Sequence, residues 1–86
     1  MRLAFTDRFR KSYGALAEGD AKRVRKALQL LGTDPRHPSL RVKKMQGTDR
    51  IWEARTSRSL RVTFEIQEDR VLLRNVGAHD ATLKNP

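Results

Sequence analysis

Residues 40–66, LRVKKMQGTDRIWEARTSRSLRVTFEI, contain three short segments in which apolar and polar residues alternate, and turn-forming residues separate these segments. Successive side chains of a β-strand point to opposite sides, so an alternating segment has one apolar and one polar face. In the last segment the apolar face is formed by Leu60, Val62, Phe64 and Ile66, and the polar face by Arg61, Thr63 and Glu65. This pattern predicts a half-buried strand.

The middle segment has the same alternation. Trp52, Ala54 and Thr56 share one face, and Ile51, Glu53, Arg55 and Ser57 share the other. If the middle and last segments pair in antiparallel fashion through residues 57–59, Glu53, Arg55 and Arg61 lie on one polar face of the sheet. Trp52 points the other way, which favours packing in the core over stacking on a base.

The rest of the chain extends this sheet and adds helices. Strands are predicted at 2–5, 40–45, 50–57, 60–67 and 70–77, and the last four are joined by loops of hairpin length, which predicts an antiparallel meander. Helices are predicted at 7–17, capped by Thr6, and at 21–31, capped by Asp20. Residues 81–86 are a tail or one helical turn. We therefore expect one α+β domain over residues 1–86, ordered β-α-α-β-β-β-β, with a four-stranded meander, a helical pair on one face and the other face partly open.

The net charge of the chain indicates which kind of ligand it binds. The 86 residues carry 19 Lys and Arg against 10 Asp and Glu, a net charge of +9, which predicts a polyanion as ligand: RNA, DNA, an acidic protein or an anionic membrane surface. No apolar run is long enough to cross a membrane, and the first residues lack a secretory signal. The absence of cysteine excludes disulfides and thiol catalysis and fits a cytoplasmic location.

Basic residues on the predicted sheet are the leading functional candidates. Arg55 and Arg61 project from one face, and a guanidinium presents a rigid fork of donors that matches phosphate oxygens. The alternative is a pair of solvated arginines. Further RNA-binding candidates are Arg41, Lys43, Lys44 and Arg58. Lysines on an edge strand also prevent aggregation between sheets, and this alternative stays open. The basic side of the second helix indicates a solvated face, with RNA or partner contact as the alternative.

Two more residues could take part in proton transfer. His79 follows the last strand, and histidine can donate or accept a proton near neutral pH, although a surface role is the alternative. Glu53 shares the face of Arg55 and is either a general base or the ion-pair partner of an arginine. His37 lies between prolines and is expected to be structural. The histidines and acids show no metal-site spacing, so no metal cofactor is predicted.

Three segments together resemble the RelE/ParE toxin superfamily of bacterial toxin–antitoxin systems, on the RelE side. They are HPSLRVKKMQG at 37–47, IWEARTSRSLRVTFEI at 51–66 and DRVLLRNVGAHD at 69–80. The resemblance covers about residues 1–80. It implies a type II toxin that inhibits translation as a metal-independent endoribonuclease of messenger RNA, usually on the ribosome, with a cognate antitoxin as its partner in a hetero-oligomer.

The resemblance also assigns roles to residues. Arg55 and Arg61 match basic positions on adjacent strands, and His79 matches the position after Val-Gly where family members have a catalytic arginine or histidine. Glu53 corresponds to a lysine in some members. The sequence departs from the family because the tail DATLKNP has no tyrosine, whereas many family nucleases have one that stacks on the substrate base.

Two alternatives share this fold. One is a ParE-like inhibitor of DNA gyrase without nuclease chemistry, against which the grouping of Arg55, Arg61 and His79 weighs. The other is a non-catalytic co-repressor that acts on DNA together with its antitoxin. The sequence does not encode a recognisable signal for codon preference, for the identity of the antitoxin or for the stoichiometry of the complex.

Overall fold

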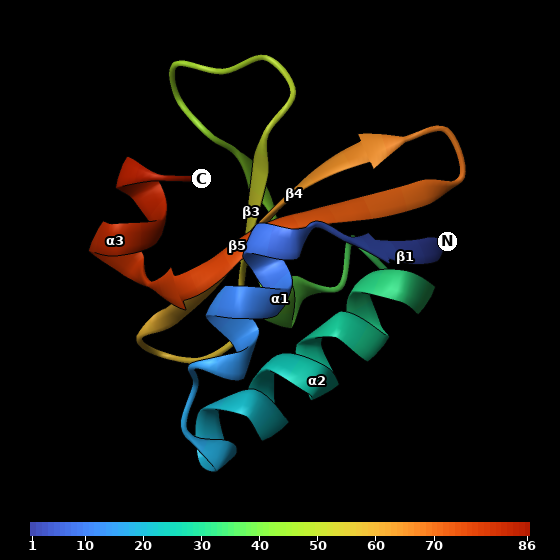
Figure 1. The fold of residues 1–86 in the computed structure, drawn as a ribbon. Helices are drawn as coiled ribbons and strands as arrows, with labels where there is room; N and C mark the ends of the chain where they lie inside the picture. The colour runs from blue at the N-terminus through green and yellow to red at the C-terminus, as the bar shows by residue number, and fades with distance from the viewer.

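The structure is a computed structural model that describes residues 1–86, with the exception of the side chain of Leu83. The elements in chain order are β1 (Arg2–Phe5), α1 (Asp7–Gly14), α2 (Glu18–Thr33), the 3₁₀ turn η1 (Pro38–Leu40), β2 (Lys43–Lys44), β3 (Trp52–Arg55), β4 (Leu60–Gln67), β5 (Arg70–Ala78) and α3 (His79–Lys84). Figure 1 shows the two longer helices beside a twisted sheet, with α3 apart from them at the opposite side of the view.

The sheet has five strands in the order β1-β5-β4-β3-β2. Strands β2 to β5 are paired in antiparallel fashion, so the predicted meander is confirmed. The first strand adds to the predicted four: β1 pairs with β5 in parallel, with Arg2 opposite Arg70. Parallel neighbours need a long crossover connection, and the chain from α1 to β4 supplies it.

One face of the sheet packs against α1 and α2, as the apolar stripes of the two helices predict. The core cluster contains Phe9 of α1, Val24, Ala27, Leu28 and Leu31 of α2, Leu40, and Ala54, Leu60, Val62, Phe64, Val71, Leu73 and Val76 of the sheet. Trp52 packs against this cluster, in agreement with the predicted core role. Ile66 lies beyond it and is 46% exposed, because the strand end extends past the helices.

The helix boundaries differ from prediction at three ends. Thr6 caps α1 as predicted: its hydroxyl accepts from the backbone N–H of Phe9. Helix α1 ends at Gly14, three residues early, and α2 begins at Glu18 with Ala17 as its cap residue. Asp20 therefore lies inside the first turn, where its charge favours the positive end of the helix dipole, and is not the cap. Helix α2 also continues past Gly32 to Thr33.

The segment before the hairpin contains less strand than predicted. The predicted strand at 40–45 is reduced to Lys43–Lys44, because η1 occupies Pro38–Leu40 and Arg41 adopts a left-handed conformation with φ 47°. The predicted strand at 50–57 is observed at Trp52–Arg55, whereas β4 matches its predicted range.

A β-bulge in β5 changes which residues face the core. Thr63 pairs with Asn75 but Phe64 pairs with Leu73, so Arg74 is an extra residue on β5. The bulge shifts the alternation by one position, and both Leu73 and Val76 are buried in the core.

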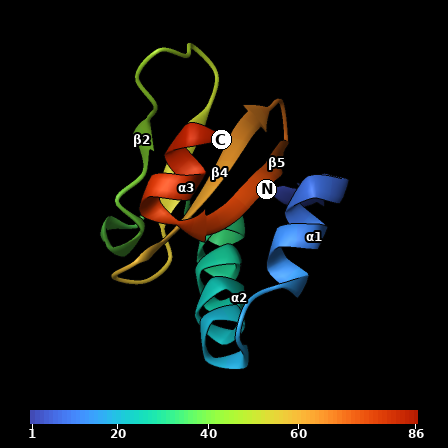
Figure 2. The same cartoon turned by 60° about the vertical axis from the view of Figure 1, so that its left-hand side comes forward.

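Helix α3 packs on the face of the sheet opposite α1 and α2, where only a tail or one turn was predicted. Figure 2 shows α3 and α1 on opposite sides of the β4–β5 hairpin. A Cβ atom placed on Gly77 would lie 3.3 Å from the Thr82 hydroxyl, so the missing side chain allows this close approach. The outer face is consequently covered at the β5 side and open toward β3 and β2.

Candidate nucleic-acid interface

Arg55 and Arg61 form a directly opposed pair on the outer face of the sheet, as predicted. They are register partners across β3 and β4. Arg55 Nε donates to the carbonyl oxygen of Ser57 at 3.3 Å, and Arg61 Nη1 donates to the same oxygen at 3.2 Å. Among the side chains that the structure describes, neither arginine has an acidic partner within ion-pair distance. Two adjacent, half-buried and unneutralised guanidinium groups offer the charge and the fork of donors that an anion-binding site needs.

His79 lies at the same end of the sheet as this pair. Ala78 is opposite Leu60 in the β4–β5 register, and the backbone N–H of His79 donates to the carbonyl oxygen of Ser59 at 3.2 Å. The residue is the first of α3, and its side chain is 45% exposed, with Nδ1 3.3 Å from a carboxylate oxygen of Asp80. The backbone of His79 is therefore held at the end of the sheet that carries the arginine pair, and an accessible imidazole is a group type that proton transfer at a phosphate needs.

Glu53 is paired with a lysine and not with the arginine that the sequence predicted. It is opposite Lys43 in β2 and opposite Thr63 in β4, so neither candidate arginine is its direct cross-strand partner. The carboxylate is 3% exposed and lies 3.6 Å from Lys43 Nζ. Glu53 therefore holds the ammonium group of Lys43 on the outer face of the sheet, at its open side.

The other predicted RNA-binding residues fall on different surfaces. Lys43 shares the outer face with Glu53, whereas the ammonium of Lys44 lies 5.6 Å from the centre of the Trp52 ring on the helix side. Arg41 does not share a strand face with Lys43, because it terminates η1 and lies outside β2. Arg58 is exposed in the turn between β3 and β4. The structure thus brings Arg55, Arg61 and His79 together and separates Arg41 and Lys44 from them.

The sequence did not predict the role of Arg74 or the position of two basic residues of α2, whose side was expected to be solvated, with RNA or partner contact as the alternative. Arg74, on the bulge, pairs with Glu65 and donates from Nε to the carbonyl oxygen of Pro86 at 3.2 Å, which fixes the end of the chain on the outer face. No sequence pattern predicts a bulge or the return of the tail. Arg23 and Lys26 line a hollow opposite the β3–β4 turn. Their spacing of three residues could have placed them on one helix face, but not opposite that turn.

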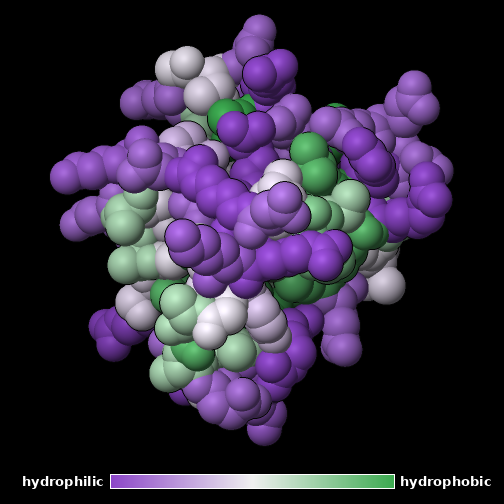
Figure 3. All heavy atoms as spheres, viewed as in Figure 1, coloured by the Kyte–Doolittle hydropathy of each residue, from purple (hydrophilic) through white to green (hydrophobic). Residues whose placement is uncertain are grey.

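Elsewhere on α2, Arg25 forms an ion pair with Glu18. Hydrogen bonds from Arg25 to Glu18 and to the Tyr13 hydroxyl raise the pKa of Arg25 above its ordinary value. Within the described side chains, no three His, Asp or Glu residues are grouped as metal ligands would be. Figure 3 shows hydrophilic side chains over most of the face seen there, with the hydrophobic surface divided into small areas.

The arrangement of strands and helices matches that of solved toxin structures. No protein-family model matches the sequence, and no curated protein shows significant sequence similarity. Solved structures match along nearly the whole chain. YafQ from Escherichia coli strain BL21(DE3) superposes with a TM-score of 0.80 at 12% identity, covering 95% of this chain and 98% of that one.

Two toxin–antitoxin complexes give the same result. The E. coli DinJ–YafQ complex matches with a TM-score of 0.78 at 15% identity, covering 94% of this chain and 97% of that one. The intact E. coli RelBE complex matches with a TM-score of 0.72 at 20% identity, covering 90% and 94%. The chain therefore has the RelE/YafQ toxin fold, and the predicted fold class is confirmed. None of the described helices is long and apolar enough to cross a membrane.

Proposed function

We propose that this protein is the toxin of a type II toxin–antitoxin system and cleaves messenger RNA on the ribosome without a metal ion. The observation that carries this proposal is the opposed Arg55–Arg61 pair next to His79, on a RelE/YafQ-like fold. A protein that only blocked gyrase or assisted a repressor would have no need for an unneutralised guanidinium pair beside an accessible imidazole.

The reaction uses the ribose 2′-hydroxyl of the RNA as the nucleophile. Its oxygen forms a bond to the adjacent phosphorus, the bond to the 5′-oxygen breaks, and the products are a 2′,3′-cyclic phosphate and a free 5′-hydroxyl. Arg55 and Arg61 bind the phosphate oxygens and stabilise the charge that develops on them. His79 carries out one of the two proton transfers, as the base that takes the 2′-hydroxyl proton or as the acid that protonates the 5′-oxygen, and water exchanges the other proton. Glu53, buried against Lys43, positions a cation and is not the base.

The partner we propose is a cognate antitoxin in the cytoplasm, with an acidic or amphipathic segment. DinJ–YafQ and RelBE are complexes of this kind, and a net charge of +9 gives association rate and specificity toward a segment of opposite charge. RNA and acidic protein would then compete for one basic surface.

Induction in bacteria tests the activity. We expect growth to stop and new 5′ ends to appear within translated messages. Arg61→Ala should abolish both effects, whereas Arg70→Ala should retain them, because Arg70 lies at the far end of β5 and contacts Gln67. Intact messages together with broken chromosomes would contradict the proposal and indicate a gyrase inhibitor.

A further inference from the structure

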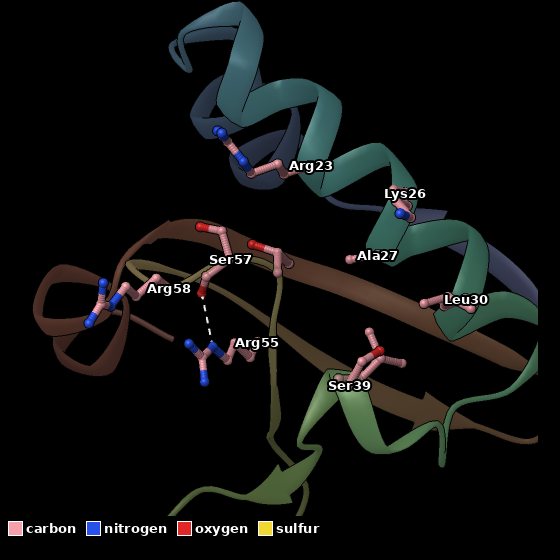
Figure 4. A pocket seen from close by; sticks show the side chains of 10 residues that line it. Arg23, Lys26, Ala27, Leu30, Ser39, Arg55, Ser57 and Arg58 are labelled. Carbon is pink, nitrogen blue, oxygen red and sulfur yellow. Dashed lines mark hydrogen bonds between the residues drawn. The ribbon is translucent and has the colours of Figure 1, made fainter.

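A groove separates α2 from the turn that joins β3 and β4. It has a volume of about 380 Å³, and it is lined by residues of α2, of η1 and of the β3–β4 turn. Figure 4 shows Arg23 and Lys26 on the helix across from Ser57 and Arg58 on the turn, with Arg55 just below. Arg55, at the end of β3, lines the groove as well, so the groove reaches the end of the sheet that carries the Arg55–Arg61 pair on its outer face.

The charge in this groove is of one sign. Four of the residues that line it are basic and none is acidic. Arg23 lies 3.4 Å from Asp20, but both side chains are largely exposed, so this ion pair neutralises little. Among the described side chains, Lys26 and Arg58 form no ion pair at all. The groove thus concentrates positive charge that this chain does not compensate.

The groove is lined by apolar as well as cationic side chains. In Figure 4 the guanidinium groups of Arg23, Arg55 and Arg58 lie toward the left of the view, whereas Ala27 and Leu30 lie toward the right, with Lys26 beside them. Thr56 is another lining residue, although its hydroxyl oxygen is buried and has no hydrogen-bond partner among the described atoms. Cations on both sides and the apolar side chains of Ala27 and Leu30 match a nucleotide, which has a charged phosphate and an apolar base face.

We propose that this groove binds a nucleotide of the substrate RNA strand adjacent to the phosphate held by Arg55 and Arg61, an inference that rests on the function proposed above. Arg55 belongs to both surfaces, because it lines the groove and is the register partner of Arg61. An RNA backbone with a charge at every nucleotide can pass from the groove around the end of β3 to the arginine pair on the outer face, with Arg55 between the two sites. This continuity favours RNA over an acidic protein segment, which would need no connection to the arginine pair.

The test compares two double variants with the same loss of charge. Lys26→Gln with Arg58→Gln removes two exposed cations of the groove, and Lys11→Gln with Lys22→Gln removes two exposed cations outside it. The probe is a short single-stranded RNA with 2′-O-methyl groups, which cannot be cleaved, and binding is followed by fluorescence anisotropy at several salt concentrations. The groove variant should bind about tenfold more weakly, and its salt slope should fall by roughly 0.7, since the nucleotide in the groove contributes one phosphate contact.

The control variant should keep the parent's salt slope within experimental error. Equal slopes for the groove variant and the control, or no binding of this RNA by the parent protein, would overturn the inference. So would a groove variant that loses only its affinity for an antitoxin, because the groove would then belong to a protein partner. If the groove variant binds RNA weakly as expected but the parent cleaves no message, the groove assignment stands and the proposed nuclease activity fails.

Discussion

The opposed arginines should repel one another in the free protein, and a double-mutant cycle can measure this repulsion. Arg55 and Arg61 are direct register partners and donate to the same carbonyl oxygen of Ser57. Directly opposite Cβ atoms lie about 5 Å apart, and two unit charges at that spacing repel by about 0.8 kcal/mol in a medium as polar as water. Both guanidinium groups also compete for the carbonyl oxygen of Ser57, which adds to the unfavourable coupling. We therefore expect a repulsive coupling of about 0.5–1 kcal/mol.

The cycle consists of the parent, Arg55→Gln, Arg61→Gln and the double variant, each unfolded in urea at low and high salt. The coupling should shrink as salt rises, because the Debye length falls from about 10 Å at 0.1 M to about 3 Å at 1 M. Arg2→Gln and Arg70→Gln form a matched control: these two arginines are also register partners, but Asp69 lies 3.7 Å from Arg2 and Gln67 accepts from Arg70. That pair should couple more weakly. An attractive or salt-independent coupling between Arg55 and Arg61 would refute the description of the site as an unneutralised cation pair.

Three further outcomes are expected. His79→Gln should slow single-turnover cleavage on programmed ribosomes by on the order of 10²-fold while RNA binding changes little, and unchanged cleavage would exclude His79 as the acid or base. At a constant Mg²⁺ concentration that keeps the ribosome intact, cleavage should be insensitive to a chelator selective for transition metals, since the described residues offer no metal site, and restoration of activity by added zinc or manganese would contradict the mechanism. Thr6→Ala should lower the free energy of unfolding by about 1–2 kcal/mol, because the hydroxyl accepts from the backbone N–H of Phe9 and donates to the carbonyl oxygen of Leu73 at 3.0 Å. The control Thr33→Ala, at the exposed end of α2, should lower it by less than about 0.5 kcal/mol.

Local alternation was sufficient to predict the central hairpin. The bounds of β4 and the opposition of Arg55 and Arg61 follow from period-two patterning and a short turn, both of which are properties of neighbouring residues. The capping role of Thr6 also depends only on neighbouring residues, because a capping hydroxyl contacts the first turn of its own helix, and the sequence therefore predicted it.

What the sequence did not predict depends on contacts between distant segments. The partner of Glu53 is Lys43, and this pairing is set by the register of β2 on β3. The bulge at Arg74 shifts the alternation in β5, and α3 packs over Gly77, a position whose role is visible only once the helix is in place. The groove containing Lys26 and Arg58 likewise forms between elements far apart in the chain.

The pairing of β1 with β5 has a consequence for the order of folding. The strand partners of Arg2 to Phe5 are Arg70 to Leu73, so β1 cannot pair in the sheet until residues 70–73 have been synthesised. The β3–β5 meander closes short loops and can form early, whereas docking of β1 closes a loop that spans most of the protein and carries a larger entropy cost. Until then one edge of β5 is open, and a nascent chain at this stage is vulnerable to proteolysis and to pairing with another strand.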